Sequence, residues 1–176
     1  MKKYIAFLRG VNVGNIRIKM SDLKTTFERL DCQDVTTYLQ TGNVVFTSDK
    51  TLTDLKPVLE VGLRQTFDYQ AFVLLYNFDL LADIVAKYPF ERLETHHAYV
   101  LFVENATTFN DLKTLAESVG DESTRIKLGD NHVIYWQVER GESLTTPFAK
   151  IMAKAKYKSS TTVRNVNTLE KMVEGG

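Results

Sequence analysis

The sequence has few of the residues that cross-link a chain or bind a metal. Cys32 is the single cysteine among 176 residues, which excludes an internal disulfide. The three histidines add no recognisable zinc site, because His96 and His97 are adjacent and would point to opposite sides of a strand. We therefore predict no metal site, and the low cysteine content suits the reducing cytoplasm.

A long hydrophobic run is missing at the start of the sequence. The apolar run from Tyr4 to Leu8 is five residues long, and Arg9 ends it. This is too short for the core of a signal peptide or for a membrane span. Such a run is typical of a strand that is covered on both faces. We expect a cytoplasmic protein that does not associate with a membrane.

Neither sign of charge is in excess. The chain has 22 Lys and Arg residues and 22 Asp and Glu residues, which argues against binding of nucleic acid or an anionic membrane by the surface as a whole. An apolar fraction of 44% and a charged fraction of 25% are ordinary for a folded globule. A chain of 176 residues can bury a hydrophobic core without a disulfide or a metal.

The charges are nevertheless distributed unevenly along the chain. Residues 1–19 and 143–169 contain no acid, whereas the charged residues within 104–122 are acids with the exception of Lys113. The basic residues of the two acid-free segments are Lys2, Lys3, Arg9, Arg17 and Lys19, and then Lys150, Lys154, Lys156, Lys158 and Arg164. If these segments meet in space, they form a positive site for an anion. The alternative is that each is a solvated face whose charge is compensated elsewhere.

Hydrophobic periodicity and turn residues predict the same order of elements in both halves of the chain. The strands expected in the first half are 4–8, 35–40, 43–48 and 70–76, with one helix that Ser21 caps and another that begins near Pro57. Only Thr41 and Gly42 separate the middle strands, which predicts a tight hairpin.

The second half repeats this order. The strands expected there are 98–103, 125–128, 133–138 and 160–163, with one helix that stops at Gly120 and another that starts at Thr146-Pro147 and extends to Ala155. A connecting helix is expected at 79–88. Asn167 and Glu170 have the spacing of a capping box for a last helix.

The order strand-helix-strand-strand-helix-strand is the ferredoxin-like pattern. We predict an α+β fold of two tandem ferredoxin-like (βαββαβ) subdomains with extra connecting and C-terminal helices. Residues 1–77 form the first subdomain, 78–95 the connecting helix and loop, and 96–176 the second subdomain with the C-terminal helix. The central strands are apolar on both faces and no Gly/Ser/Pro-rich linker is present, so we expect the halves to pack as one body.

One polar motif lies between the first strand and the first helix. The loop from Arg9 to Asn15 contains Gly10 and Gly14, and a glycine loop in this place can direct backbone N–H groups at an anion. Its glycine spacing fits neither a Walker loop nor the dinucleotide fingerprint. The alternative is a long turn that needs glycine at positive φ.

Two further motifs carry side-chain amides. Gln40 and Asn43 flank the predicted hairpin turn and could present amides to a ligand, although turn residues also bond their own backbone. Arg164, Asn165 and Asn167 precede the last predicted helix. They suit an anion or a carbonyl-bearing ligand, or they simply cap that helix.

These motifs resemble those of a bacterial family of uncharacterised proteins, the domain of unknown function 1697. The stretch Phe7–Gly14 is similar to the family's opening FLRGINVGG, and Lys19–Met20 match the Lys-Met before its first helix. Thr37–Phe46 resembles TYIQSGNVVF, and Thr161–Thr168 resembles TTRNWNT with an interposed valine and with Val166 in place of the tryptophan. The resemblance spans the chain. It implies two ferredoxin-like subdomains in tandem, and it implies no activity.

Three functions are compatible with these residues. The first is binding of a small anionic, phosphate-bearing ligand in a pocket formed by the glycine loop, the first hairpin and the C-terminal Arg-Asn segment. The candidate ligand-binding residues are Arg9, Gly10, Asn12, Gly14, Lys19, Gln40, Asn43, Arg164, Asn165 and Asn167. The alternatives are a single-stranded nucleic-acid module, in which Tyr4, Phe7 and Phe46 would lie on an open sheet face, and a structural or interaction protein without a ligand. No nucleophile–base pair is visible, so the sequence assigns no catalytic residue and no cofactor.

Overall fold

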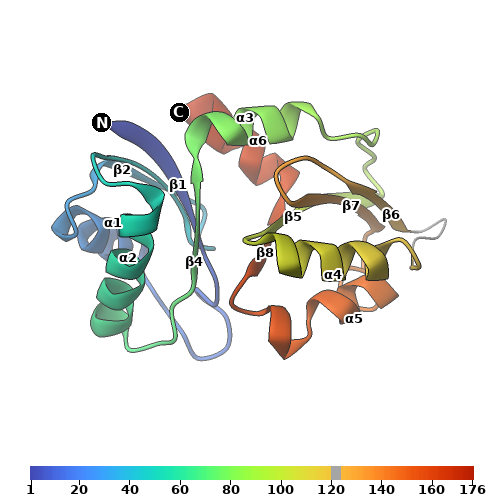
Figure 1. The fold of residues 1–176 in the computed structure, drawn as a ribbon, viewed down its shortest axis with the longest axis horizontal. Coiled ribbons are helices and arrows are strands. Elements are labelled where there is room, and N and C mark those ends of the chain that lie inside the picture. Colours follow the sequence, from blue (N-terminus) through green and yellow to red (C-terminus); the bar gives the residue numbers. More distant parts are fainter. Residues whose placement is uncertain (120–123) are drawn as a thin grey trace. The chain divides into compact units, whose positions relative to one another are not determined.

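The computed structural model describes residues 1–119 and 124–176 and has a mixed α+β fold with two four-stranded antiparallel sheets (Figure 1). By its internal contacts the chain divides into two units. The first unit comprises Met1–Ala82 and Lys171–Gly176, and the second comprises Asp83–Glu170. Within the described ranges, no helix combines the length and the apolar character that crossing a membrane requires.

The first unit contains one sheet with two helices between its strands. In chain order its elements are β1 (Lys2–Leu8), α1 (Met20–Arg29), β2 (Gln33–Tyr38), β3 (Asn43–Ser48), α2 (Leu52–Phe67) and β4 (Val73–Asn77), followed by the start of α3 (Phe78–Ala86). The strands are arranged in the order β2-β3-β1-β4. β1 is central and antiparallel to both neighbours, with Tyr4 opposite Phe46 on β3 and Ala6 opposite Leu75 on β4.

β1 is buried on both faces, as its continuous apolar run predicts. Tyr4, Ala6 and Leu8 belong to a hydrophobic cluster with residues of α1 and α2, and Figure 1 shows these two helices side by side. Ile5 and Phe7 point to the opposite face and are 0% exposed. Tyr4, Phe7 and Phe46 are therefore enclosed, and bases cannot stack on these three rings as they do in ferredoxin-like RNA modules.

Two boundaries near the start of the chain differ from the prediction. α1 begins at Met20 and its N-cap is Lys19, not Ser21, because the extended Lys19 places its carbonyl to accept the N–H groups of Asp22 and Leu23. β2 ends at Tyr38, so four residues rather than two connect it to β3. The cause is Leu39, whose φ of 56° lies outside the range of a strand.

The second helix also begins earlier than predicted. α2 starts at Leu52, and Thr51 caps it by accepting the N–H of Asp54 at 3.2 Å. Pro57 lies inside the helix and is exposed. Its missing N–H removes one bond on the solvent side, whereas the apolar stripe that includes the fully buried Leu55 already requires the first helical turn.

The second unit has the same order of elements. After the end of α3 come β5 (His96–Val103), α4 (Ala106–Ala116), β6 (Thr124–Leu128), β7 (Val133–Glu139), α5 (Pro147–Met152), the 3₁₀ helix η1 (Ala155–Tyr157), β8 (Thr161–Asn165) and the start of α6 (Val166–Gly175). The strand order β6-β7-β5-β8 corresponds to that of the first sheet. Thr146 caps α5 by accepting the N–H of Ala149 at 3.2 Å, which confirms the predicted start of this helix.

Two helix ends in this unit differ from the prediction. The capping box was wrong, because Asn165 rather than Asn167 caps α6 by accepting the N–H of Asn167 at 2.8 Å. Glu170 instead accepts a bond of 2.6 Å from Arg92. α5 ends at Met152, short of the predicted Ala155, and η1 follows it. The predicted stop at residue 120 lies outside the described residues.

The segment 83–95, from the middle of α3 to the start of β5, covers part of the second sheet on the side away from α4 and α5. The hydroxyl of Tyr135 donates to the carbonyl of Ile84 at 2.7 Å. The hydroxyl of Tyr88 donates to the carbonyl of Trp136 at 3.0 Å, and the rings of Tyr88 and Tyr135 meet edge to face at 5.7 Å. The sheet face of β7 is thereby enclosed within the second unit.

Candidate functional site

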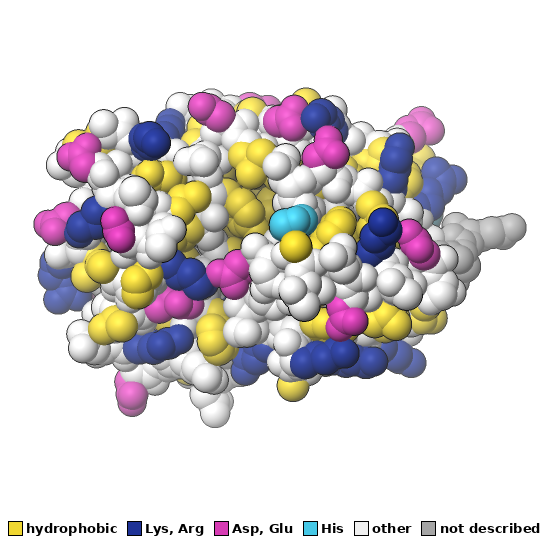
Figure 2. Space-filling model, viewed as in Figure 1, with side chains coloured by type: hydrophobic (Ala, Val, Ile, Leu, Met, Phe, Trp, Pro, Cys, Tyr) yellow, Lys and Arg dark blue, Asp and Glu magenta, His cyan; other side chains and the backbone are white. Residues whose placement is uncertain are grey.

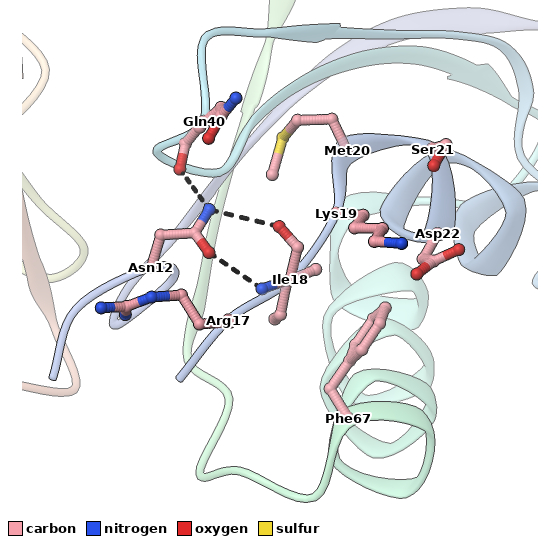
Figure 3. Close-up of a pocket in the computed structure, with 9 residues that line it drawn as sticks. All are labelled: Asn12, Arg17, Ile18, Lys19, Met20, Ser21, Asp22, Gln40 and Phe67. Carbon is pink, nitrogen blue, oxygen red and sulfur yellow. Dashed lines mark hydrogen bonds between the residues drawn. The ribbon is translucent and has the colours of Figure 1, made fainter. Parts of the chain in front are cut away.

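A pocket of about 600 Å³ opens in the first unit at the start of α1 (Figure 3). Its residues come from the glycine loop, the first turn of α1, the β2–β3 connection and the end of α2. The residues that line it are Asn12, Arg17, Ile18, Lys19, Met20, Ser21, Asp22, Gln40 and Phe67.

Asn12 fixes one side of the pocket through three hydrogen bonds. Its side-chain amide donates to the carbonyl of Gln40 at 2.7 Å and to the carbonyl of Ile18 at 3.2 Å. Its side-chain oxygen accepts the N–H of Ile18 at 2.9 Å, as the dashed lines in Figure 3 show. Asn12 has a φ of 56°, a conformation that asparagine tolerates better than most residues. The glycine loop and the β2–β3 connection are therefore held together by one side chain.

The N-terminus of α1 lies in the pocket wall without a side-chain cap. Lys19 is the N-cap residue and makes no capping bond through its side chain. The backbone N–H groups of Met20 and Ser21 have no acceptor in the described part of the chain. Free N–H groups at the start of a helix carry partial positive charge and favour an anion.

The charged side chains of the pocket are more basic than acidic. Lys19 is exposed and forms no ion pair with any described residue. Arg17 is also exposed, and its guanidinium donates to the carbonyls of Gly14 at 2.8 Å and Ile16 at 3.0 Å. Asp22 is the acid of the lining. The lining thus contains two cations and two free N–H groups but one carboxylate, and this balance of charge favours an anionic ligand.

The lining of the pocket also includes three apolar side chains. Ile18 and Met20 come from the approach to α1, and Phe67 comes from the last residue of α2. Figure 3 shows the Phe67 ring extending from α2 towards the first turn of α1. The half-buried ring offers a flat apolar surface beside the basic groups.

Three of the residues predicted for a ligand site line this pocket, namely Asn12, Lys19 and Gln40. Gly10 and Gly14 are in the loop but not in the lining, and their φ values of 76° and 60° are those that a long glycine turn requires.

The other two predicted residues of the first unit have structural contacts. Asn43 is buried on β3, and its amide donates to the carbonyl of Tyr38 at 3.0 Å and to the hydroxyl of Thr41 at 2.7 Å. The half-buried Arg9 donates its backbone N–H to the carbonyl of Phe72 at 3.1 Å. Burial lowers the pKa of the Arg9 guanidinium from its ordinary value. Neither residue lines the pocket.

Arg164, Asn165 and Asn167 belong to the second unit. Asn165 caps α6, which agrees with the capping interpretation of this motif. The side-chain oxygen of Asn167 accepts a hydrogen bond from Arg92, and the guanidinium of Arg164 donates to the carbonyl of Val163 at 3.1 Å. Their participation in the same pocket as the glycine loop stays a prediction.

Several lining residues were not among the predicted ones. Ser21 and Asp22 lie in the first turn of a helix that starts two residues earlier than predicted, so the sequence held a signal for them. Arg17 was counted in the basic segment but not assigned to a site. Phe67 had no sequence signal, because only the packing of α2 beside α1 brings it to the pocket.

The described residues offer no constellation for covalent or metal chemistry. They include no group of three or more His, Cys, Asp or Glu side chains that could hold a metal ion. Cys32 is 3% exposed, and burial raises the pKa of its thiol to about 11, so the nucleophilic thiolate is scarce at neutral pH.

Comparisons with known proteins agree with this fold. The family model described as "Protein of unknown function (DUF1697)" matches residues 1–135. No curated protein matches the chain. The solved structure of the conserved bacterial protein SP0830 from Streptococcus pneumoniae is similar, with a TM-score of 0.82 and 22% sequence identity over 99% of this chain and 98% of that chain. At this identity the likeness shows the fold alone.

Proposed function

The chain belongs to the DUF1697 family of proteins of unknown function, and we propose that the pocket of its first unit binds a small anionic ligand that carries a phosphate. The observation that carries the proposal is the uncapped start of α1, where the N–H groups of Met20 and Ser21 are free beside the unpaired Lys19. A phosphate oxygen accepts from such N–H groups, and a lysine ammonium adds a charge-assisted bond.

The rest of the pocket favours a ligand with an apolar part attached to the phosphate. Ile18, Met20 and Phe67 line the same pocket as the basic groups, and an aromatic ring packs well against a planar heterocycle. Mononucleotides and other phosphate esters with a flat apolar group have this combination. Inorganic phosphate would occupy only the polar end.

The element order and the strand orders β2-β3-β1-β4 and β6-β7-β5-β8 support a finer description of the fold. We infer that each unit contains a ferredoxin-like subdomain, the first within residues 1–77 and the second within residues 96–170. The second subdomain was expected to extend to residue 176, but Lys171–Gly176 belong to the first unit. Residues 78–95 are then the connection, which starts where α3 follows β4 without a gap.

A structural role without a ligand is the competing proposal. Asn12 supports it, because its side-chain amide and oxygen are both used in bonds to the loop and the β2–β3 connection. Such bonds would be needed to fix the loops even if nothing bound there. The two proposals differ in whether any anion stabilises the protein.

Thermal unfolding in the presence of inorganic phosphate, nucleoside phosphates and sugar phosphates separates the two proposals. A ligand at 100 times its Kd adds about 2.7 kcal/mol to the stability and raises the Tm. We expect Lys19→Gln to raise the Kd for the phosphate compound about tenfold. Lys24→Gln removes the same charge from an exposed position of α1 and should leave the Kd unchanged. Equal effects of the two variants, or no stabilisation by any phosphate compound, would refute ligand binding at this pocket.

The backbone N–H of Met20 can be tested separately. Met20 is the first residue of α1 and follows the extended Lys19, which is a position that proline tolerates. Met20→Pro removes the N–H, whereas Met20→Ala removes the apolar side chain and keeps the N–H. Weaker phosphate binding by the proline variant than by the alanine variant assigns the N–H to the ligand.

A further inference from the structure

A second basic surface lies in the second unit, on α5 and the turn that follows it. Lys150, Lys154, Lys156 and Lys158 are all exposed. Among the described residues, only Lys156 of these four has an ion-pair partner, Asp111 at 3.5 Å. Figure 2 shows dark blue side chains gathered along the edge where α5 lies in Figure 1. Three lysine charges are therefore uncompensated within a short stretch.

The backbone that carries these lysines is anchored. Tyr157 is 2% exposed and packs in the hydrophobic cluster of the second unit. Its hydroxyl donates to the carboxylate of Asp111 at 3.1 Å, and its carbonyl accepts the hydroxyl of Thr161 at 2.9 Å. Because Tyr157 lies between Lys156 and Lys158, their main-chain positions are fixed before any partner arrives.

A shallow groove of about 570 Å³ separates this turn from α4. Lys154 and Lys156 form one wall. The other wall is the face of α4 that carries Thr107, Asn110, Asp111 and Thr114, spaced i, i+3, i+4 and i+7 on the helix. Apart from Asp111, which Lys156 and Tyr157 already engage, the polar groups of this wall are short and neutral.

We propose that this groove binds the sugar–phosphate backbone of duplex nucleic acid without reading its sequence. Lysine ammonium groups neutralise phosphates, and Thr and Asn side chains donate to phosphate and sugar oxygens. The partner follows from charge complementarity and from the lack of an exposed ring among residues 147–160, since Tyr157 is buried. A single strand that meets no aromatic platform forgoes base stacking, whereas the bases of a duplex are already stacked and its backbone offers sugars and phosphates to a basic surface.

An anionic membrane fits this surface less well. Stable docking of a basic segment on a bilayer usually includes large apolar side chains that enter the headgroup region. Between 147 and 160 the described chain has no exposed large hydrophobic residue; Leu144, which is 87% exposed, lies in the loop before α5, and one such side chain is a weak bilayer anchor. Vesicle binding is therefore an outcome that would contradict the proposal.

Fluorescence anisotropy of a short labelled duplex, measured over a series of salt concentrations, tests the proposal. We expect binding whose log K falls with log salt by about 0.9 for each phosphate contacted. Lys154→Gln with Lys158→Gln should reduce that slope by about 1.8 and weaken binding at low salt more than tenfold. The double variant Lys24→Gln with Lys127→Gln removes the same charge from exposed positions outside the groove and should bind as the unchanged protein does.

The charge-retaining pair Lys154→Arg with Lys158→Arg should also keep the affinity, which separates lost charge from lost folding. Lys19→Gln should have no effect on duplex binding, so the test is independent of the pocket in the first unit. The proposal is overturned if the duplex does not bind at low salt. Equal loss in the control pair would overturn it too, as would lysine-dependent binding to phosphatidylserine vesicles without duplex binding.

Discussion

The side-chain amide of Asn12 donates to the backbone carbonyl of Gln40 at 2.7 Å and thereby joins two loops that are distant in the sequence. The same side chain closes the glycine loop, because it bonds both the backbone N–H and the backbone carbonyl of Ile18. One wall of the pocket thus depends on a residue whose own backbone has a φ of 56°.

Replacing Asn12 by glycine should lower the free energy of unfolding by about 2 kcal/mol, because three hydrogen bonds are lost. Glycine keeps the positive φ of this position at no steric cost, so the change reports the side chain. The measurement is urea unfolding. Asn15→Gly is the matched control, since Asn15 is exposed and forms no hydrogen bond with the described residues. An equal loss of stability in both variants would show that the three hydrogen bonds of Asn12 do not stabilise the protein.

Gly42→Ala should destabilise the protein more than Gly14→Ala. Both glycines have positive φ, 80° and 60°, and alanine there costs about 1–2 kcal/mol. A Cβ at Gly42 would also lie 2.8 Å from the Cβ of Leu8, whereas one at Gly14 meets nothing within 4 Å. We expect a total of about 3 kcal/mol for Gly42→Ala, including overpacking. Similar unfolding midpoints for the two variants would contradict the close packing of β1 against this turn.

Local signals in the sequence were sufficient for much of the fold. The continuous apolar run of β1 predicted a strand buried on both faces, and Thr146 with Pro147 predicted the start of α5, because strand burial and helix capping depend on neighbouring residues. The length of the β2–β3 connection was missed, since Leu39 carries no signal for its positive φ.

The candidate site was predictable only in part, for a related reason. Asn12, Lys19 and Gln40 lie in polar motifs that stand out in the sequence. Phe67 is an ordinary apolar residue at the end of α2, and its place in the pocket results from the packing of two helices. Single-residue patterns do not carry that information, since tertiary contacts decide it.

Cys32 should react slowly with maleimide in the folded protein at neutral pH. It is 3% exposed, and burial raises the pKa of its thiol to about 11, with Lys50 lowering the value and Asp31 raising it to smaller extents. Reaction requires an accessible thiolate. Labelling in urea should be complete and fast. Equally fast labelling without urea would contradict the burial of this residue.

Stability should fall in strongly alkaline solution as buried tyrosines lose their protons. Burial raises the pKa of Tyr69, Tyr88 and Tyr135 from 10.0 to about 12. The folded state then binds more protons than the unfolded state, so this contribution is complete below about pH 10 and is lost as the pH rises through about 12. Urea unfolding on either side of pH 10 measures the decline.

Tyr88→Phe should make that alkaline decline shallower. It should also cost about 1 kcal/mol near neutral pH, because the hydroxyl no longer bonds the carbonyl of Trp136. An unchanged pH dependence in this variant would contradict the raised pKa of Tyr88.

Amide NMR during a titration with a nucleoside monophosphate shows whether a phosphate binds at the start of α1. We expect the N–H signals of Met20 and Ser21 to shift and saturate, and Lys19→Gln to weaken the response while Lys24→Gln does not. Signals at these two positions that stay unchanged, while the ligand shifts residues elsewhere or none at all, would contradict phosphate binding there.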